Sequence, residues 1–269
     1  MFDAEIKLLR ENPPLVHCIT NPVTINDCAN LLLSCGASPI MADDPMETAE
    51  VVSSASALVL NLGMPNPRKL EGMLTAGKEA NRRKIPVVLD PVGVGVSRFR
   101  TESVQRLLKE IEFSVIRGNI SEIHALCGIA SSSRGVDALA DMTQEQIHDA
   151  VHHLANATGA VVAVSAATDV VTDGLRRIHI HGGTPLMSRI SGTGCMLTAL
   201  IGMFCGVLPQ DPLKAATLAC ALMKRFGEHA ALMMECRNTG FSSMRRYLID
   251  TASRLDFLAL QGGFHIEDW

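Results

Sequence analysis

Short runs of apolar, β-branched residues alternate along this chain with longer stretches in which apolar positions recur every three or four residues. The first pattern is typical of buried strands and the second of amphipathic helices. The predicted strands cover residues 15–20, 38–42, 57–63, 86–93, 113–119 and 160–166. The predicted helices cover residues 24–37, 67–84, 121–128 and 145–159. This alternation predicts an α/β fold, with a mainly parallel central sheet and helices on both faces.

Single residues indicate where several of these elements begin and end. Gly36 suits the left-handed position just past the end of a helix, and a helix is expected to follow Pro67. Ser121 is a candidate N-cap for the helix that begins there. The segment 131–144 is strongly polar, and we expect a surface loop with a short helix.

The second half of the chain has a different pattern. Residues 169–174 and 176–182 resemble strands with Asp-Gly and Gly-Gly ends, which favour antiparallel pairing at the end of the sheet. From Gly194 to about Arg254 the pattern is helical almost throughout. Because no repeat, linker or low-complexity tract interrupts the chain, we expect a single domain over residues 1–269.

Composition excludes several classes of partner. The chain has 269 residues, 47% of them apolar, which is ample for a buried core. Its net charge is −4 and its cations are scattered, so we expect no nucleic acid partner. The N-terminal segment lacks a signal-peptide core, and no apolar run is long enough to span a bilayer. We therefore expect a cytoplasmic protein that makes no membrane contact.

Polar residues stand at the ends of three predicted strands. Asp90 ends "VVLD", Arg117 and Asn119 lie in "VIRGN", and Ser165 ends "VVAVS". In an open α/β sheet, ligands bind beyond the carboxyl ends of the strands. We expect these side chains to converge on one pocket, together with the loop "SGTGC" at residues 191–195.

The loop at residues 191–195 has the composition of an anion site. Gly192 and Gly194 would let backbone N–H groups approach a phosphate, and the helix that follows would present the positive end of its dipole. An ordinary tight helix start explains the loop equally well. Its spacing matches neither G-x-x-x-x-G-K-[ST] nor G-x-G-x-x-G, which disfavours a P-loop NTPase and a standard dinucleotide fold.

Asp90 and Glu122 are of the type that holds Mg²⁺, which is usually bound by one or two carboxylates, water and substrate phosphates. Glu122 alone could instead be an acidic residue that stabilises the first turn of its helix. Arg117 could neutralise phosphate charge, or could be a surface arginine at a strand end. Only the combination of these residues favours a phosphoryl-transfer site.

Four segments together resemble the hydroxyethylthiazole kinases, a thiamine-salvage family of the ribokinase-like superfamily. They are "LVHCITNPVTINDCANLLLSCGASPIMA", "VVLDPVGVG", "VIRGNISEI" and "SGTGC", and the resemblance runs in order from about residue 14 to about residue 250. It implies a ribokinase-like three-layer sandwich that phosphorylates the hydroxyl of 4-methyl-5-(2-hydroxyethyl)thiazole with ATP and Mg²⁺. It also implies a homotrimer whose sites lie between subunits.

The resemblance assigns a role to each residue that matches the family's motifs. Cys195 matches the family's proton acceptor, and the carboxylates at the Mg²⁺–phosphate region are Asp90 and Glu122. The substrate-binding positions are Met41, Gly192, Asn21 and Val23. The ATP-binding positions are Arg117, Ser165, Asn119, Thr193 and Gly194. The chain departs from the family at Ser165-Ala166, where Thr-Gly is usual, and at Pro22, where an aromatic residue is common.

Three other functions compete with this interpretation. A kinase for a different small alcohol, such as hydroxymethylpyrimidine or a sugar, is disfavoured by Cys195. The broader superfamily carries the motif G-x-G-D at this point, with Asp as the base. A cysteine-nucleophile enzyme is a second alternative, since a helix N-terminus lowers a thiol pKa. The eight cysteines include no C-x-x-C pair, and most are expected to be reduced core residues. A regulator that binds both ligands without consuming ATP is the third alternative.

Overall fold

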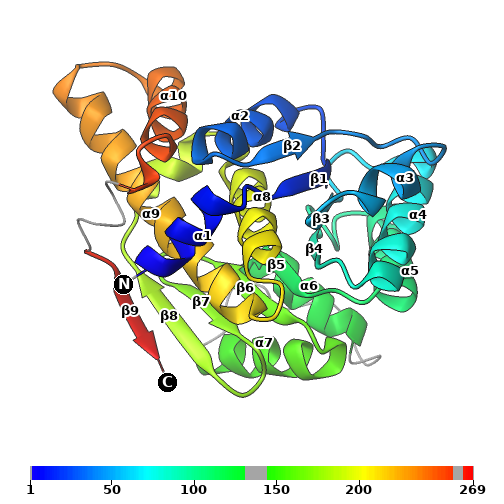
Figure 1. Cartoon of the computed structure of the whole chain (residues 1–269). Coiled ribbons are helices and arrows are strands. Elements are labelled where there is room, and N and C mark those ends of the chain that lie inside the picture. The colour runs from blue at the N-terminus through cyan, green and yellow to red at the C-terminus, as the bar shows by residue number, and fades with distance from the viewer. Residues whose placement is uncertain (1, 131–143, 257–262, 269) are drawn as a thin grey trace.

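Nine strands in the described parts of the chain form one sheet at the centre of the molecule (Figure 1). The structure is a computed structural model, and it describes residues 2–130, 144–256 and 263–268. The strands are β1 Leu15–Ile19, β2 Ser38–Ile40, β3 Ala57–Asn61, β4 Val87–Asp90, β5 Val115–Asn119, β6 Val161–Ser165, β7 Asp169–Thr172, β8 Arg177–His181 and β9 His265–Asp268. Their order across the sheet is β2-β1-β3-β4-β5-β6-β7-β8-β9.

Strands β2 to β6 pair in parallel, whereas β6 to β9 pair antiparallel. This confirms the mainly parallel sheet with antiparallel pairing at its end. The register aligns Asn61 with Asp90, and Asn119 with Ser165. The carboxyl ends of β3 to β6 therefore lie at the same edge of the sheet.

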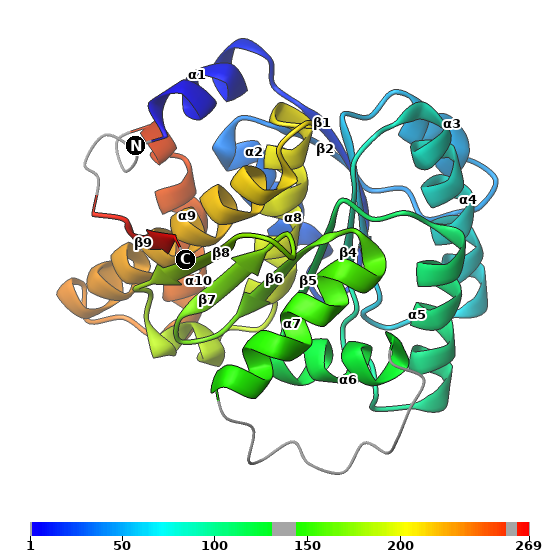
Figure 2. The ribbon, with the colours of Figure 1, turned by 90° about the horizontal axis from the view of Figure 1, so that it is seen from below.

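Helices cover both faces of the sheet and make the molecule three layers deep (Figure 2). One face carries α1 Asp3–Glu11, α2 Ile25–Cys35, α8 Thr193–Val207, α9 Pro212–Cys236 and α10 Phe241–Ala252. The other face carries α3 Thr48–Ser53, α4 Pro67–Arg83, α5 Arg98–Glu110, α6 Ile120–Ala130 and α7 Gln144–Thr158. A 3₁₀ turn, η1 Pro185–Arg189, precedes α8. The predicted three-layer α/β fold is confirmed.

Helix α8 packs against β1, β3 and β4, and every residue from Met196 to Cys205 is buried. A Cβ atom at Gly202 would stand 2.3 Å from Cγ2 of Val59 on β3, so only glycine allows this close approach. A helix that is apolar on all sides is expected in such a position. This packing places the N-terminus of α8 at the carboxyl edge of the sheet.

The predicted elements begin and end within three residues of the observed ones. Gly36 ends α2 with φ of 92°, and α4 begins at Pro67, where the Asn66 side chain accepts a hydrogen bond from the Lys69 N–H. The C-terminal part is helical as expected, from α8 through α10. Nearly all of the predicted loop 131–144 lies outside the described residues. No helix among the described residues is long and apolar enough to cross a membrane.

The predicted cap at Ser121 is wrong, because α6 already begins at Ile120. The Asn119 side chain accepts a hydrogen bond from the Glu122 N–H, and the Glu122 carboxylate accepts one from the Asn119 N–H, both at 2.9 Å. This reciprocal pair is a capping box, with Asn119 as the N-cap. The sequence analysis also did not assign α1, α3, α5 or β9.

Candidate active site

A chain of hydrogen bonds joins the carboxyl ends of β3 and β4 to helix α8. The Asn61 amide nitrogen lies 2.7 Å from Oδ2 of Asp90 and 3.3 Å from Sγ of Cys195. Thr198, one turn into α8, donates to the same Asp90 oxygen at 2.8 Å. Asp90 and Cys195, which the sequence analysis selected, are therefore brought together through Asn61.

The Cys195 thiol has two amide neighbours and little solvent. The Asn61 amide and, at 3.5 Å, the Asn21 amide donate hydrogen bonds to Sγ. Burial, followed by the negative charge of Asp90, raises the pKa of this thiol, although the hydrogen bonds act in the opposite direction. A raised pKa disfavours a cysteine-nucleophile enzyme, which requires a low thiol pKa.

Asp90 is a fully buried carboxylate with one oxygen left open. Burial raises its pKa to about 6, against the lowering effect of the Arg117 guanidinium and the hydrogen bonds from Thr198 and Asn61. Oδ1 has no hydrogen-bond partner among the described residues, and the Arg117 Nη1 atom lies 3.8 Å away. An open oxygen on a buried carboxylate is suited to a metal ion or a metal-bound water.

Glu122 is held at the same edge by the backbone. Its two carboxylate oxygens accept hydrogen bonds from the Gly93 N–H and the Asn119 N–H, each at 2.9 Å. A carboxylate oxygen accepts more than one bond, so both oxygens keep capacity for a metal-bound water. Among the described residues no three His, Cys, Asp or Glu side chains form a complete metal site. Asp90 and Glu122 thus fit an Mg²⁺ ion whose shell is completed by water and phosphate.

The N-terminus of α8 has the features of an anion site. Its N-cap, Gly192, has φ of 89° and provides no side-chain cap for the first N–H groups of the helix. Arg117 lies against this terminus, because a Cβ atom at Gly194 would be 2.5 Å from Nη1 of Arg117. Uncapped N–H groups, the helix dipole and a guanidinium together favour a bound phosphate.

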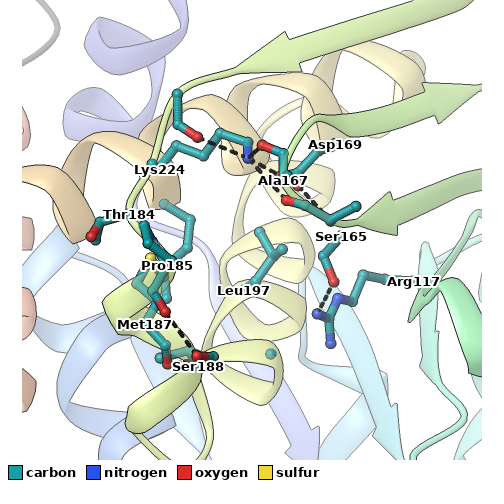
Figure 3. A pocket seen from close by; sticks show the side chains of 16 residues that line it. Arg117, Ser165, Ala167, Asp169, Thr184, Pro185, Met187, Ser188, Leu197 and Lys224 are labelled. Atoms are coloured by element: carbon teal, nitrogen blue, oxygen red, sulfur yellow. Dashed lines mark hydrogen bonds and ion pairs between the residues drawn. The ribbon is translucent and has the colours of Figure 1, made fainter.

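A pocket of about 610 Å³ opens beside this terminus (Figure 3). Four of the predicted ATP-binding residues line it: Arg117, Ser165, Thr193 and Gly194. The Arg117 guanidinium donates a hydrogen bond to the Ser165 hydroxyl. Asn119 is not among the lining residues and acts as the cap of α6 instead. The pocket is therefore large enough for a small-molecule ligand and is lined by the expected phosphate-binding groups.

Two of the predicted substrate residues, Asn21 and Gly192, lie at the first turn of α8. Asn21 is buried beside Cys195, and Gly192 stands against Thr24, whose Cγ2 would be 2.5 Å from an added Cβ atom. Met41 follows β2 and is partly buried against the core on the face of the sheet that carries α2 and α8. Val23 is 61% exposed. None of these four residues lines the pocket described above.

The departure at Ser165-Ala166 introduces no backbone strain. Ala166 is not among the non-glycine residues with positive φ, so the turn after β6 does not require glycine there. The Ala166 N–H instead donates to the Asp169 carboxylate at 2.9 Å. The alanine is therefore compatible with the pocket wall.

Four residues that the sequence analysis did not select contribute to the site and the pocket: Asn61, Thr198, Asp169 and Lys224. Asn61 could have been found, because it ends the strand "ALVLN" just as Asp90 ends "VVLD". Lys224 carries a weaker signal, a cation within the apolar helix "ACALMKRFG". Thr198 has no local signal, because a buried helical threonine is common.

Comparison with known proteins gives consistent results. The model of the hydroxyethylthiazole kinase family matches residues 6–257. A hydroxyethylthiazole kinase of Clostridium beijerinckii is 50% identical over 250 residues, which cover 92% of this chain and 90% of that protein. One of Thermoanaerobacter pseudethanolicus is 46% identical over 235 residues, covering 87% of this chain and 88% of that protein.

Solved structures agree with this relationship. The hydroxyethylthiazole kinase of Pyrococcus horikoshii superposes with a TM-score of 0.87 at 34% identity, over 100% of this chain and 98% of that chain. A pyridoxal kinase of Staphylococcus aureus in complex with ADP has a TM-score of 0.60 at 16% identity, over 81% of this chain and 89% of that one, which indicates a shared fold alone. The match of the family model along nearly the whole chain, together with these relatives, shows that this protein belongs to the hydroxyethylthiazole kinase family.

Proposed function

We propose that this protein transfers the γ-phosphoryl group of ATP to the hydroxyl of 4-methyl-5-(2-hydroxyethyl)thiazole, a step of thiamine salvage. The observation that carries the proposal is the uncapped N-terminus of α8, with Arg117 and Asp90 on one side and Cys195 at the third residue of the helix. Phosphoryl transfer requires positioned reactants and neutralised charge more than covalent help. We treat residues 1–269 as a single kinase domain, since the described strands form one sheet.

ATP would occupy the pocket between the turn after β6 and η1. Arg117, fixed by the Ser165 hydroxyl, would face the phosphates, and the first N–H groups of α8 would bind the transferred group. Asp90 and Glu122 would hold Mg²⁺, which when bound neutralises phosphate charge. Burial and hydrogen bonds keep both carboxylates in place before the ligand arrives: the Asn61 and Thr198 side chains donate to Asp90, and backbone N–H groups donate to Glu122.

The thiazole would bind on the other side of the α8 terminus, near Asn21, Gly192 and Met41. A methionine suits a flat, polarizable ring through sulfur–aromatic contacts. Cys195 would orient the hydroxyl toward the phosphate, with Sγ held by the two amides. Because the pKa of this thiol is raised, we assign it an orienting role. As the new O–P bond forms and the bond to the leaving ADP breaks, the proton of the alcohol passes late to an oxygen of the transferred phosphoryl group.

The substrate assignment is tested by a coupled assay of ATP consumption with Mg²⁺ over a panel of alcohols. The panel contains hydroxyethylthiazole, hydroxymethylpyrimidine, ribose and pyridoxal. We expect the highest kcat/KM with hydroxyethylthiazole, because an uncharged site with a methionine favours an apolar ring. A higher kcat/KM with any other alcohol would reject the assignment, and binding without ADP release would identify a regulator.

We also propose a homotrimer with sites between subunits. Apolar side chains remain exposed at and near α2, among them Val23 at 61% and Leu33 at 57%. Charge at such a position opposes association. We expect sedimentation velocity to give a trimer for the wild type and a smaller species for Leu33→Asp. The control is Leu175→Asp, at a position that is 92% exposed in the turn between β7 and β8 and should not alter the mass. A fully active wild-type monomer would contradict this assembly.

The role of Cys195 is tested by steady-state kinetics at saturating ATP. We expect Cys195→Ala to lower kcat by no more than about 10²-fold, the lower end of what a well-placed general base contributes. Cys195→Asp should keep or raise kcat, because its carboxylate accepts the same two amide hydrogen bonds and is ionised at neutral pH. Cys205→Ala, a core change on the same helix, is the matched control. Loss of all activity in Cys195→Asp, with a trapped covalent cysteine adduct, would show a nucleophile instead.

The raised pKa of Asp90 predicts a pH dependence. Only the ionised form can bind a cation, so kcat/KM should fall as the pH drops below about 6, where a normal carboxyl would still be ionised. Thr198→Val removes a hydrogen-bond donor to the ionised form of Asp90 and so raises its pKa. The fall of kcat/KM on the acid side should then move to a pH higher by roughly one unit.

The matched control for this change is Thr217→Val. Like Thr198, Thr217 is a buried helical threonine, but its hydroxyl donates to the Leu213 carbonyl and does not contact Asp90. We expect its pH–rate profile to coincide with that of the wild type. If kcat/KM of Thr198→Val falls at the same pH as that of the wild type, Asp90 does not control the acid side of the profile.

A further inference from the structure

The Lys224 ammonium is enclosed by oxygen atoms at the edge of the pocket (Figure 3). Nζ lies 3.3 Å from the Ala166 carbonyl oxygen, 3.0 Å from that of Ala167 and 3.2 Å from that of Gly182. A fourth oxygen, Oδ1 of Asp169, lies at 3.1 Å. The lysine side chain is only 10% exposed, so water contributes little to this environment.

This arrangement is chemically equivalent to a site for a monovalent cation. An ammonium group has three donor hydrogens, and the oxygens around Nζ outnumber them. Carbonyl oxygens grouped around a single positive charge are also what replaces the water shell of K⁺ in proteins. Because its donors are already engaged, Lys224 has none to spare for a ligand in the pocket.

The carbonyl oxygens around Nζ belong to two chain segments that both line the pocket. Ala166 and Ala167 lie in the turn between β6 and β7, whereas Gly182 follows β8. Without the positive charge of Lys224 between them, the two segments would present carbonyl oxygens to each other. Removing that charge therefore leaves buried, like-charged oxygens facing each other, which is costly in an environment with little water.

Helix α9 contacts both the C=O and the N–H of the peptide unit that joins Gly182 to Gly183. Lys224 donates to the Gly182 carbonyl, and Glu228, one turn later, accepts the N–H of Gly183 at 2.6 Å. These two groups belong to the same peptide unit. Gly182 and Gly183 have φ of 103° and 84°, which favours glycine at both positions. The pocket wall is therefore positioned by a rigid, buried helix rather than by its own strands alone.

We propose that Lys224 is a built-in monovalent cation that positions the two walls of the nucleotide pocket, and that the chain lacking it would require NH₄⁺ or K⁺ to bind ATP. The inference rests on the assignment of this pocket to ATP. Lys224 is a positioning residue here: it acts through the carbonyl groups and not on the reacting atoms. Wild-type ATP binding is accordingly insensitive to the identity of the monovalent salt.

The test is chemical rescue of Lys224→Ala. We expect the KM for ATP, and the Kd of a non-hydrolysable ATP analogue measured by calorimetry, to rise on the order of tenfold. The change in kcat should be smaller. At constant ionic strength, NH₄⁺, K⁺ or propylammonium should restore most of the affinity, whereas tetramethylammonium, which cannot donate or fit, should not. Lys224→Gln keeps a terminal N–H donor without the charge, and it should also bind ATP more weakly.

Lys214→Ala is the matched control, because Lys214 lies on the same helix and pairs with Glu5 away from the pocket. It should show wild-type KM and no response to ammonium. Equal effects of all the cations on Lys224→Ala, or a wild-type KM in Lys224→Gln, would overturn the proposal. A wild-type protein that binds no ATP analogue would instead reject the assignment of the pocket, so the two failures can be told apart.

Discussion

The close approach of Arg117 to the first turn of α8 is the constraint on which the site depends. A Cβ atom at position 194 would stand 2.5 Å from the guanidinium, so any residue other than glycine would require the end of the Arg117 side chain to shift. The guanidinium and the helix terminus are both positive, so they are stable side by side when a negative charge lies between them. Asp90 supplies part of that charge within the chain, and a phosphate would supply the rest.

Asp90 connects this terminus to the rest of the site. A fully buried carboxylate is costly, and the raised pKa of Asp90 expresses that cost directly. Asn61 and Thr198 stabilise one of its oxygens, while the other is left open. The negative charge of Asp90 also raises the pKa of Cys195, and the Asn61 amide contacts both groups.

The pocket wall illustrates how segments between strands become rigid. Turns usually lie at the surface and move more than the elements they connect. Here the turn after β6 and the glycine pair after β8 are fixed by side chains of α9, a helix that is buried over much of its length. Precise placement of a ligand is easier on such supported backbone, because less order has to be gained when the ligand binds.

The sequence by itself determined the alternation of strands and helices, and with it the edge of the sheet where Asp90, Arg117 and Ser165 stand. These features depend on local apolar periodicity and on the geometry of parallel sheets, which neighbouring residues encode. Local signals failed where two polar residues competed, as at the start of α6, where Asn119 and not Ser121 became the cap.

Only the tertiary structure decided the chemical state of the site. The pKa of Cys195 depends on burial and on a carboxylate more than a hundred positions away in the sequence. The Lys224 site likewise joins a helix to turns that lie 42 to 58 residues earlier. Hydrogen bonds and desolvation act between atoms that folding brings together, and no local pattern records such distances.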